Sequence, residues 1–191
     1  VALGMSVTVA QTLGPDGAPV SRVAVTLAEA PWGPAEVRRD VHVSADGSAG
    51  PLTTRTWLYA DAATAARHPD WAVAAESPAW HGRVAAVLRR DGSWERRGYG
   101  AHGRPSLTVR PWLSLPWEEA RGLALEEAAA RGRAERLSYE PVSPDDTPDG
   151  EGDARPRTVT ETALGQVVSR VWHIHSRAAD GGAVHAEERA A

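Results

Sequence analysis

Residues 84–99, VAAVLRRDGSWERRGY, decide how the centre of this chain folds. The apolar run at 84–88 and the run from Trp94 to Tyr99 both favour strands, and Asp91-Gly92 lies between them. Asp-Gly is a strong hairpin signal because glycine, which lacks a Cβ atom, adopts positive φ angles without a clash. The sequence therefore predicts an antiparallel β-hairpin at the centre of the chain.

Two kinds of turn would join these strands. A two-residue turn pairs Arg90 with Ser93, whereas a three-residue turn with a glycine bulge pairs Arg89 with Ser93 and places Leu88 opposite Trp94. We favour the three-residue turn because it gives the better apolar pair. A slip of one residue would turn every side chain to the other face.

The hairpin and its flanks are strongly basic. Seven arginines and two acids between His81 and Trp112 give a net charge of +5, in a chain whose formal net charge is −4. Arginines with interleaved aromatic residues can neutralise phosphates and stack on bases. The alternative is a solvated strand face whose arginines contact acids of the same chain. The candidate binding residues are Arg89, Arg90, Trp94, Arg96, Arg97, Tyr99 and Arg104.

Four strands are expected before the hairpin. Apolar residues alternate over 5–13, 20–28 and 36–44, and 52–59 is a further strand. Turn-forming glycine, proline and aspartate residues separate these runs. We therefore expect a four-stranded antiparallel meander whose first two strands are half-buried on one face.

The rest of the chain favours helix, then strand. Asp61 is a suitable N-cap for a short helix at 62–67. A long helix is expected to begin near Pro116 and to reach Leu137, because a proline and acidic residues suit a first helical turn. Residues 158–177 return to strand. The expected fold is α+β, mainly antiparallel sheet with one long and one short helix.

One domain is expected over 5–177. Its acidic loop at 141–157 should be mobile, since residues 141–154 hold five acids and no base. Residues 178–191 are expected to form a flexible tail.

Missing residue types exclude several chemistries. The chain has no cysteine, so it has no thiol nucleophile, thiolate zinc site, iron–sulfur cluster or disulfide. It also has no lysine, which excludes a lysine Schiff base and the usual phosphate-binding loop. Lysine, asparagine and phenylalanine are all absent, which favours a very GC-rich genome, bacterial or phage. We expect most of the eight tryptophans to pack in the core in place of phenylalanine.

Nothing in the sequence predicts a membrane partner. No apolar run approaches the ~20 residues that a membrane-spanning helix needs. The first residues lack the basic and apolar regions of a signal peptide. We therefore expect a soluble protein in the cytoplasm or in a phage particle.

His173 and His175 are the candidate metal ligands. Residues two apart on a strand share a face, so both imidazoles would point to the same side. Two histidines supply half of a zinc or iron site, and a third ligand would come from His42, His185 or Glu161. The alternative is a polar pair that faces solvent on an edge strand.

Two weaker motifs are rejected. Residues 98–103 match GxGxxG, but Arg104-Pro105 and a strand-like segment follow where a dinucleotide loop needs a helix. Residues 145–153 resemble a calcium loop, but Pro156 stands where the bidentate glutamate is needed.

Three functions remain, and we rank them in this order. The first is a non-catalytic binding or assembly module that presents the Arg/Trp hairpin to an acidic protein partner or to another copy. The second is nucleic-acid binding through the same hairpin. The third is a small metal-dependent enzyme that uses His173 and His175, with its other catalytic residues unknown. No cofactor is predicted beyond that divalent metal.

Overall fold

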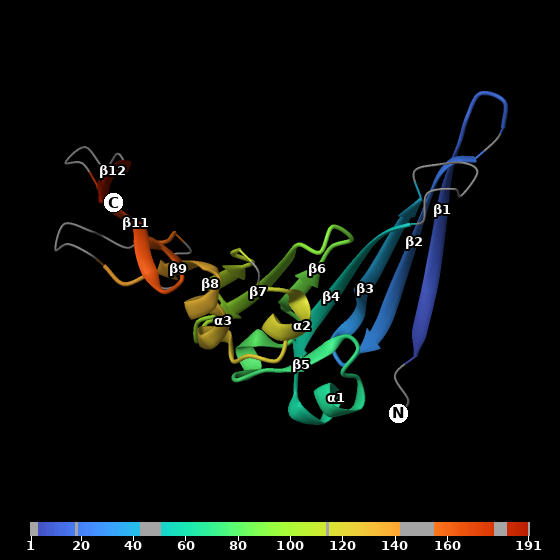
Figure 1. Cartoon of the computed structure of the whole chain (residues 1–191), viewed down its shortest axis with the longest axis horizontal. Helices are drawn as coiled ribbons and strands as arrows, with labels where there is room; N and C mark the ends of the chain where they lie inside the picture. The colour runs from blue at the N-terminus through green and yellow to red at the C-terminus, as the bar shows by residue number, and fades with distance from the viewer. Residues whose placement is uncertain are drawn as a thin grey trace. The chain divides into compact units, whose positions relative to one another are not determined.

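The structure, a computed structural model, describes residues 4–17, 19–42, 51–113, 115–141, 155–177 and 183–190. These residues form twelve strands and three short helices, so the fold is mainly β and mostly antiparallel (Figure 1). The antiparallel sheet is confirmed, whereas the α+β class is corrected to mainly β. The chain divides into two compact units, Val1–Glu95 and Arg96–Ala191. The single domain over 5–177 stays a prediction.

The first unit contains a sheet that is larger than the predicted meander. Its first four strands pair antiparallel in sequence order, as expected, but a fifth strand continues the sheet beside the fourth. A short strand, β5, pairs with β4 in parallel. The strands are β1 (Met5–Leu13), β2 (Pro19–Ala30), β3 (Gly33–His42), β4 (Leu52–Ala60), β5 (Ala72–Ala74) and β6 (Val84–Leu88).

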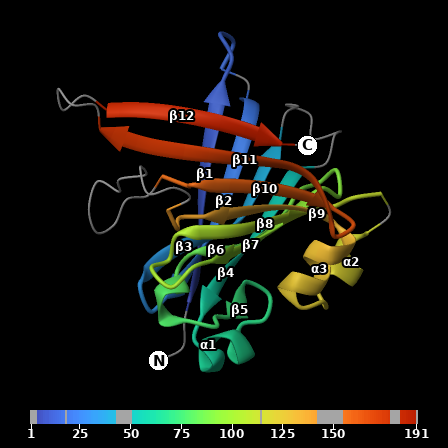
Figure 2. The ribbon, with the colours of Figure 1, turned by 90° about the vertical axis from the view of Figure 1, so that its left-hand side faces the viewer.

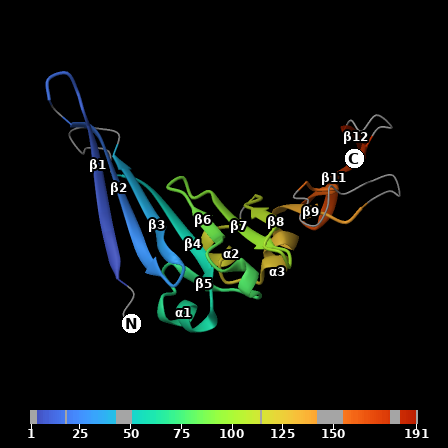
Figure 3. The ribbon, with the colours of Figure 1, turned by 180° about the vertical axis from the view of Figure 1, so that it is seen from behind.

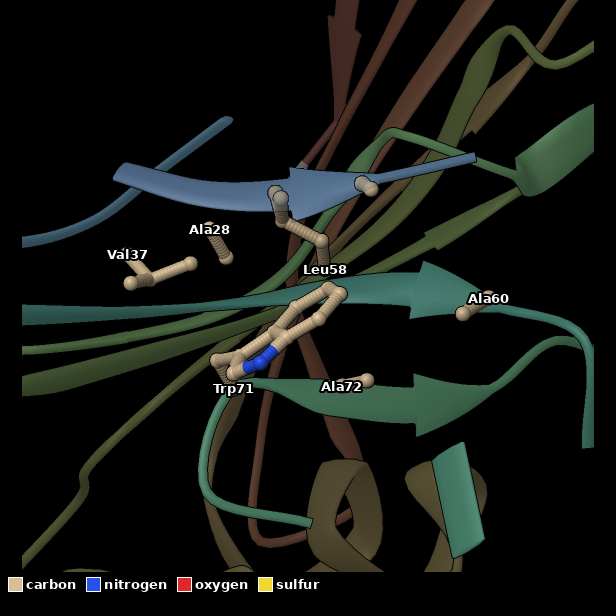
Figure 4. Close-up of a cluster of buried hydrophobic side chains, with 7 residues drawn as sticks. Ala28, Val37, Leu58, Ala60, Trp71 and Ala72 are labelled. Carbon is tan, nitrogen blue, oxygen red and sulfur yellow. The ribbon is translucent and has the colours of Figure 1, made fainter. Parts of the chain in front are cut away.

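The core of the first unit lies around Trp71. This side chain is 2% exposed, and Figure 4 shows its indole next to Leu58. Helix α1 (Ala62–Arg67) precedes Trp71 and begins at the predicted N-cap, since the Asp61 carboxylate accepts a hydrogen bond from the Thr64 amide at 2.9 Å. The other buried members of the cluster are Ala28, Ala30, Val37, Ala60 and Ala72.

We expected the first hairpin to be half-buried on one face, and the structure does not have this arrangement. Strands β1 and β2 lie side by side (Figure 3). Their register places Val7 opposite Thr26 and Thr8 opposite Val25, so the apolar sets of the two strands lie on opposite faces. Every residue of β1 is exposed. Alternation within each strand was predicted correctly, but the pairing register decides which faces coincide.

The second unit continues from β7 (Trp94–Tyr99), which begins in the first unit. Its strands pair antiparallel in the order β7-β8-β9-β10-β11-β12. Figure 2 shows β11 and β12 as a long neighbouring pair. The further strands are β8 (Pro105–Arg110), β9 (Arg133–Ser138), β10 (Thr158–Ala163), β11 (Gln166–Arg177) and β12 (Ala183–Ala190).

The predicted long helix is wrong. Two short helices, α2 (Trp117–Ala120) and α3 (Leu125–Arg131), stand in its place, and β9 follows them. Gly132 separates α3 from β9. In a helix interior, glycine is less stable than alanine by about 1 kcal/mol. Beyond it, Ala134 is buried and pairs with Val109 of β8. Pairing with two neighbouring strands therefore overrides the helical pattern of this segment.

Part of the predicted flexible tail is a strand. Residues 183–190, expected in a flexible tail, form β12 and pair with β11. Residues 142–154, the greater part of the predicted acidic loop, lie outside the described residues. Within the described ranges, none of the helices has the length and apolar character needed to cross a bilayer.

Candidate functional site

The turn of the predicted basic hairpin has the three-residue form. The Arg89 amide donates to the Ser93 carbonyl at 2.9 Å, and the Gly92 amide donates to the Arg89 carbonyl at 3.0 Å. Gly92 has φ of 80°, which is the glycine bulge expected from Asp91-Gly92. Hydrogen bonds from the Ser93 hydroxyl and amide hold the pKa of the Asp91 carboxyl below its ordinary value. The favoured register is therefore confirmed.

The first-unit binding candidates differ in exposure. Arg89 and Arg90 are exposed in the turn, whereas Trp94 is 1% exposed. A buried indole cannot stack on a base or contact a partner. The sequence carried one signal for this outcome, since the absence of phenylalanine favours tryptophans as core residues.

The second-unit candidates are also tied to their own unit. Arg96 Nη1 donates to the carbonyl of Ala120 at 2.6 Å and to that of Leu123 at 2.9 Å. Ala120 is the last residue of α2 and Leu123 lies three residues beyond it, so Arg96 binds backbone carbonyls at the C-terminal end of this short helix. Arg97 is half-buried, and Tyr99 is 7% exposed. The two aromatic candidates are thus buried, and binding through the set of candidate residues stays a prediction.

Arg104 lies in a groove of about 1030 Å³. Its guanidinium stands 5.3 Å from the centroid of the Tyr139 ring, and the Tyr139 hydroxyl donates to the Pro105 carbonyl at 2.8 Å. Burial raises the pKa of the Tyr139 hydroxyl, and the Arg104 charge opposes that rise. Sequence reasoning missed Tyr139, because nothing local indicates that β9 returns beside residue 104.

The glycine-rich bend at 98–103 forms one wall of this groove. The Gly103 amide donates to the Gly100 carbonyl at 2.9 Å, and the Gly100 amide donates to the Arg104 carbonyl at 2.8 Å. Strand β8 follows directly, so there is no helix N-terminus to receive a pyrophosphate. The strand expected after residue 104 is therefore confirmed.

Three histidines meet on β11 and β12. His175 and His185 are cross-strand partners, and His173 Nδ1 lies 3.1 Å from His185 Nε2, a hydrogen-bonding distance. Of the three proposed third ligands, the structure brings His185 to this pair. Glu161 instead accepts a hydrogen bond from Arg133 Nε at 2.6 Å, and His42 belongs to β3 of the first unit.

The histidine rings are stacked. The His175 and His185 ring centroids are 4.8 Å apart with planes at 12°, and the planes of His173 and His185 differ by 18°. The nitrogen lone pairs of an imidazole lie in its ring plane. When the rings are stacked, these lone pairs lie in separate parallel planes and do not converge on one metal ion. No group of three or more His, Asp or Glu in the described ranges is placed to hold a metal ion. A divalent metal at His173 and His175 stays a prediction.

Strand β1 is an exposed sheet edge. It has nine residues without a charge or a proline, and within the described ranges it pairs with β2 alone. The Glu29 amide donates to the Gly4 carbonyl at 2.9 Å. Hydrogen-bonded and non-bonded positions alternate along an antiparallel pair, so the even-numbered residues bond to β2. The amides and carbonyls of Met5, Val7, Val9 and Gln11 therefore point away from β2.

Comparison with known proteins gives little support for any function. No protein-family model matches the chain, and no curated protein matches it. A solved structure of a porin-like protein from Bacteroides uniformis is similar over 91% of this chain and 46% of that chain. The sequence identity is 11% and the TM-score is 0.33, values too low to carry an argument.

Proposed function

We propose that this chain is a non-catalytic binding or assembly module that joins a partner by strand addition at β1. The observation that supports this function is the exposed and uncharged edge of β1. Proteins usually protect a sheet edge with charges, proline, a bulge or a covering segment. From Met5 to Gln11, β1 has no charge, proline or register shift.

Strand addition suits the chemistry of this edge. In this mode, backbone hydrogen bonds give affinity and alternating side chains give specificity. Met5, Val7 and Val9 are 55%, 61% and 45% exposed, so they offer apolar surface beside the open amides and carbonyls. A partner strand that is uncharged and alternates apolar residues would therefore be preferred.

A labelled peptide tests strand addition directly. The probe alternates valine and threonine, with an arginine at each end for solubility, and fluorescence anisotropy reports its binding. We expect saturable binding that Val9→Pro abolishes, because proline removes an outward N–H while the bonds to β2 remain. The matched control, Val9→Ala, keeps the N–H and should keep binding. Absence of binding at a concentration where the unchanged protein is a monomer would contradict the function.

A second candidate is contact between the hairpin turn and an acidic partner. It is favoured by the exposure of Arg89 and Arg90 in the turn. Because Trp94 is buried, this contact would be electrostatic, without stacking of an aromatic ring on a base. An acidic protein surface is the proposed partner, and nucleic acid is the alternative. We expect this contact to form in the cytoplasm or in a phage particle.

The test compares salt dependence in a double variant. Labelled poly-glutamate is the probe, and a single-stranded oligonucleotide of equal charge tests the nucleic-acid alternative. If the two arginines neutralise phosphates, Arg89→Ala with Arg90→Ala lowers the slope of log affinity against log salt by about 1.4 for the oligonucleotide. If the double variant bound both probes as tightly as the unchanged protein does, this surface would be excluded as the binding site. Arg96 is unsuitable for the test because it binds backbone carbonyls of its own unit.

A further inference from the structure

We infer that the partner at the β1 edge is a second copy of this chain, with the two β1 strands antiparallel about a two-fold axis at Val9. This inference rests on the proposed function and names its partner. It follows from the direction of the backbone groups, from the side chains of β1, and from the contrast with β12.

The backbone groups permit this register. An antiparallel pair forms its hydrogen bonds between residues whose amides and carbonyls face each other. In β1 these are odd-numbered, since the Gly4–Glu29 bond assigns the even-numbered positions to β2. Pairing about Val9 places Val7 opposite Gln11 and Met5 opposite Leu13, so odd-numbered residues meet odd-numbered residues.

The side chains are complementary in the same register. On one face Val9 meets Val9 of the second copy, and Met5 meets Leu13. On the other face Ser6 meets Thr12, and Thr8 meets Ala10. A strand that pairs with itself brings like charges near each other, which is destabilising. β1 has no charge to repel its copy.

The opposite edge does not offer the same match. β12 carries Glu187, Glu188 and Arg189, all exposed. Pairing of β1 with β12 of another molecule would set these charges beside an apolar strand. It would also be head-to-tail, a contact that leaves one β1 edge unpaired and can add further copies, whereas pairing of β1 with itself uses both β1 edges in a closed two-fold contact.

Sedimentation equilibrium of the full chain tests the dimer. We expect a mass of twice 20.3 kDa for the unchanged protein and for Val9→Ala, and a mass near 20.3 kDa for Val9→Pro. The circular dichroism spectrum of Val9→Pro should match that of the unchanged protein, since the removed N–H faces away from β2. A monomer at 100 µM in the unchanged protein, or a dimer in folded Val9→Pro, would overturn the inference.

Cysteine crosslinking tests the register without a proline. The chain has no cysteine, so each variant has a single thiol. Under mild oxidation Val9→Cys should form a disulfide-linked dimer, because hydrogen-bonded cross-strand Cα atoms are about 5.5 Å apart. Leu164→Cys, on the exposed turn after β10, is the control and should stay monomeric. Equal crosslinking of both variants, or none at Val9→Cys, would overturn the register.

Together with the peptide-binding test, these two experiments separate the inference from the proposed function. If the valine–threonine peptide binds while the chain is a monomer and Val9→Cys stays uncrosslinked, strand addition holds and the second copy is wrong. If the chain is a monomer and the peptide does not bind, both are wrong.

Discussion

Arg96 has a structural role that separates it from the exposed arginines of the turn. Its guanidinium donates to two backbone carbonyls at the C-terminal end of α2, whereas Arg89 and Arg90 are exposed. Two arginines seven positions apart thus differ in their surroundings: Arg96 binds backbone carbonyls, whereas Arg89 is exposed. Charge and composition could not distinguish them, because the carbonyls that Arg96 bonds lie more than 20 residues away in the chain.

Arg96→Gln should lower the free energy of unfolding. The change removes hydrogen bonds from a charged donor, which contribute about 1.5–3 kcal/mol in folded proteins. Arg89→Gln is the matched control, and its effect should stay within about 0.5 kcal/mol because the side chain is exposed. Urea unfolding of the three proteins measures the difference. Equal stabilities would show that the carbonyls are satisfied without Arg96.

The ion pair between Glu126 and Arg136 gives a prediction for pH. Hydrogen bonds from Arg136, one of them 3.0 Å from Nη1 to Oε1, hold the pKa of the Glu126 carboxyl below its ordinary value of 4.5. The folded pKa is thus below the unfolded pKa, so the pair stabilises the fold above pH 4.5 and loses this effect as pH falls through the folded pKa. Because the Glu126 side chain is largely exposed, we expect less than about 1 kcal/mol.

The variant Glu126→Gln measures this contribution. Its stability deficit relative to the unchanged protein should be present at pH 7 and should shrink as pH falls below 4.5 and through the folded pKa of Glu126, in urea titrations at low salt. Sodium chloride at 1 M should reduce the deficit at pH 7. If the stability deficit of Glu126→Gln stayed constant with pH, its cause would be a change in side-chain packing and not the loss of the ion pair.

At the scale of elements, the chain follows its local signals in turns and caps and departs from them in the predicted long helix. Asp91-Gly92 forms its turn and Asp61 forms its cap, because both depend on backbone groups a few residues away. Residues 133–138 become β9 because β8 and β10 lie on either side to accept them. That choice depends on segments remote in sequence.

Gly132, between α3 and β9, should not tolerate a side chain. A Cβ atom there would lie 2.7 Å from the Arg110 carbonyl oxygen and 3.0 Å from that of Ala128, both backbone atoms that cannot rotate away. We expect Gly132→Ala to cost about 1–3 kcal/mol in thermal or urea unfolding.

Gly98→Ala is the control for this prediction. The Cβ atom at position 98 would also meet an atom at 2.7 Å, but that atom is Cδ2 of Leu125, the end of a side chain that can rotate. The cost should therefore be smaller than at position 132. Equal costs would show that the contact with the Arg110 carbonyl is relieved by backbone movement.

At the scale of the whole molecule, each compact unit has to bury its own apolar residues. In the first unit Trp71 is the largest fully buried side chain of the cluster that also holds Val37 and Leu58. The apolar residues of β1 lie outside that cluster and are exposed, so they are open to the partner that we propose.

Trp71→Ala should strongly destabilise the first unit. Loss of a buried tryptophan leaves a cavity and costs about 3–5 kcal/mol. Trp32→Ala is the matched control in the same unit, since that side chain is 37% exposed and should cost less. Denaturant unfolding followed by circular dichroism compares them, and similar losses would contradict the central place of Trp71.

Most of the antiparallel strands, the hairpin turn, the N-cap and the excluded chemistries could be predicted from the sequence. Each of these depends on residue type or on neighbours within a few positions. Tertiary structure alone decided that Trp94 and Tyr99 are buried, that His185 joins His173 and His175, and that the apolar faces of β1 and β2 point apart. The physical reason is that burial and register depend on contacts between segments far apart in the chain, which alternation within one strand does not specify.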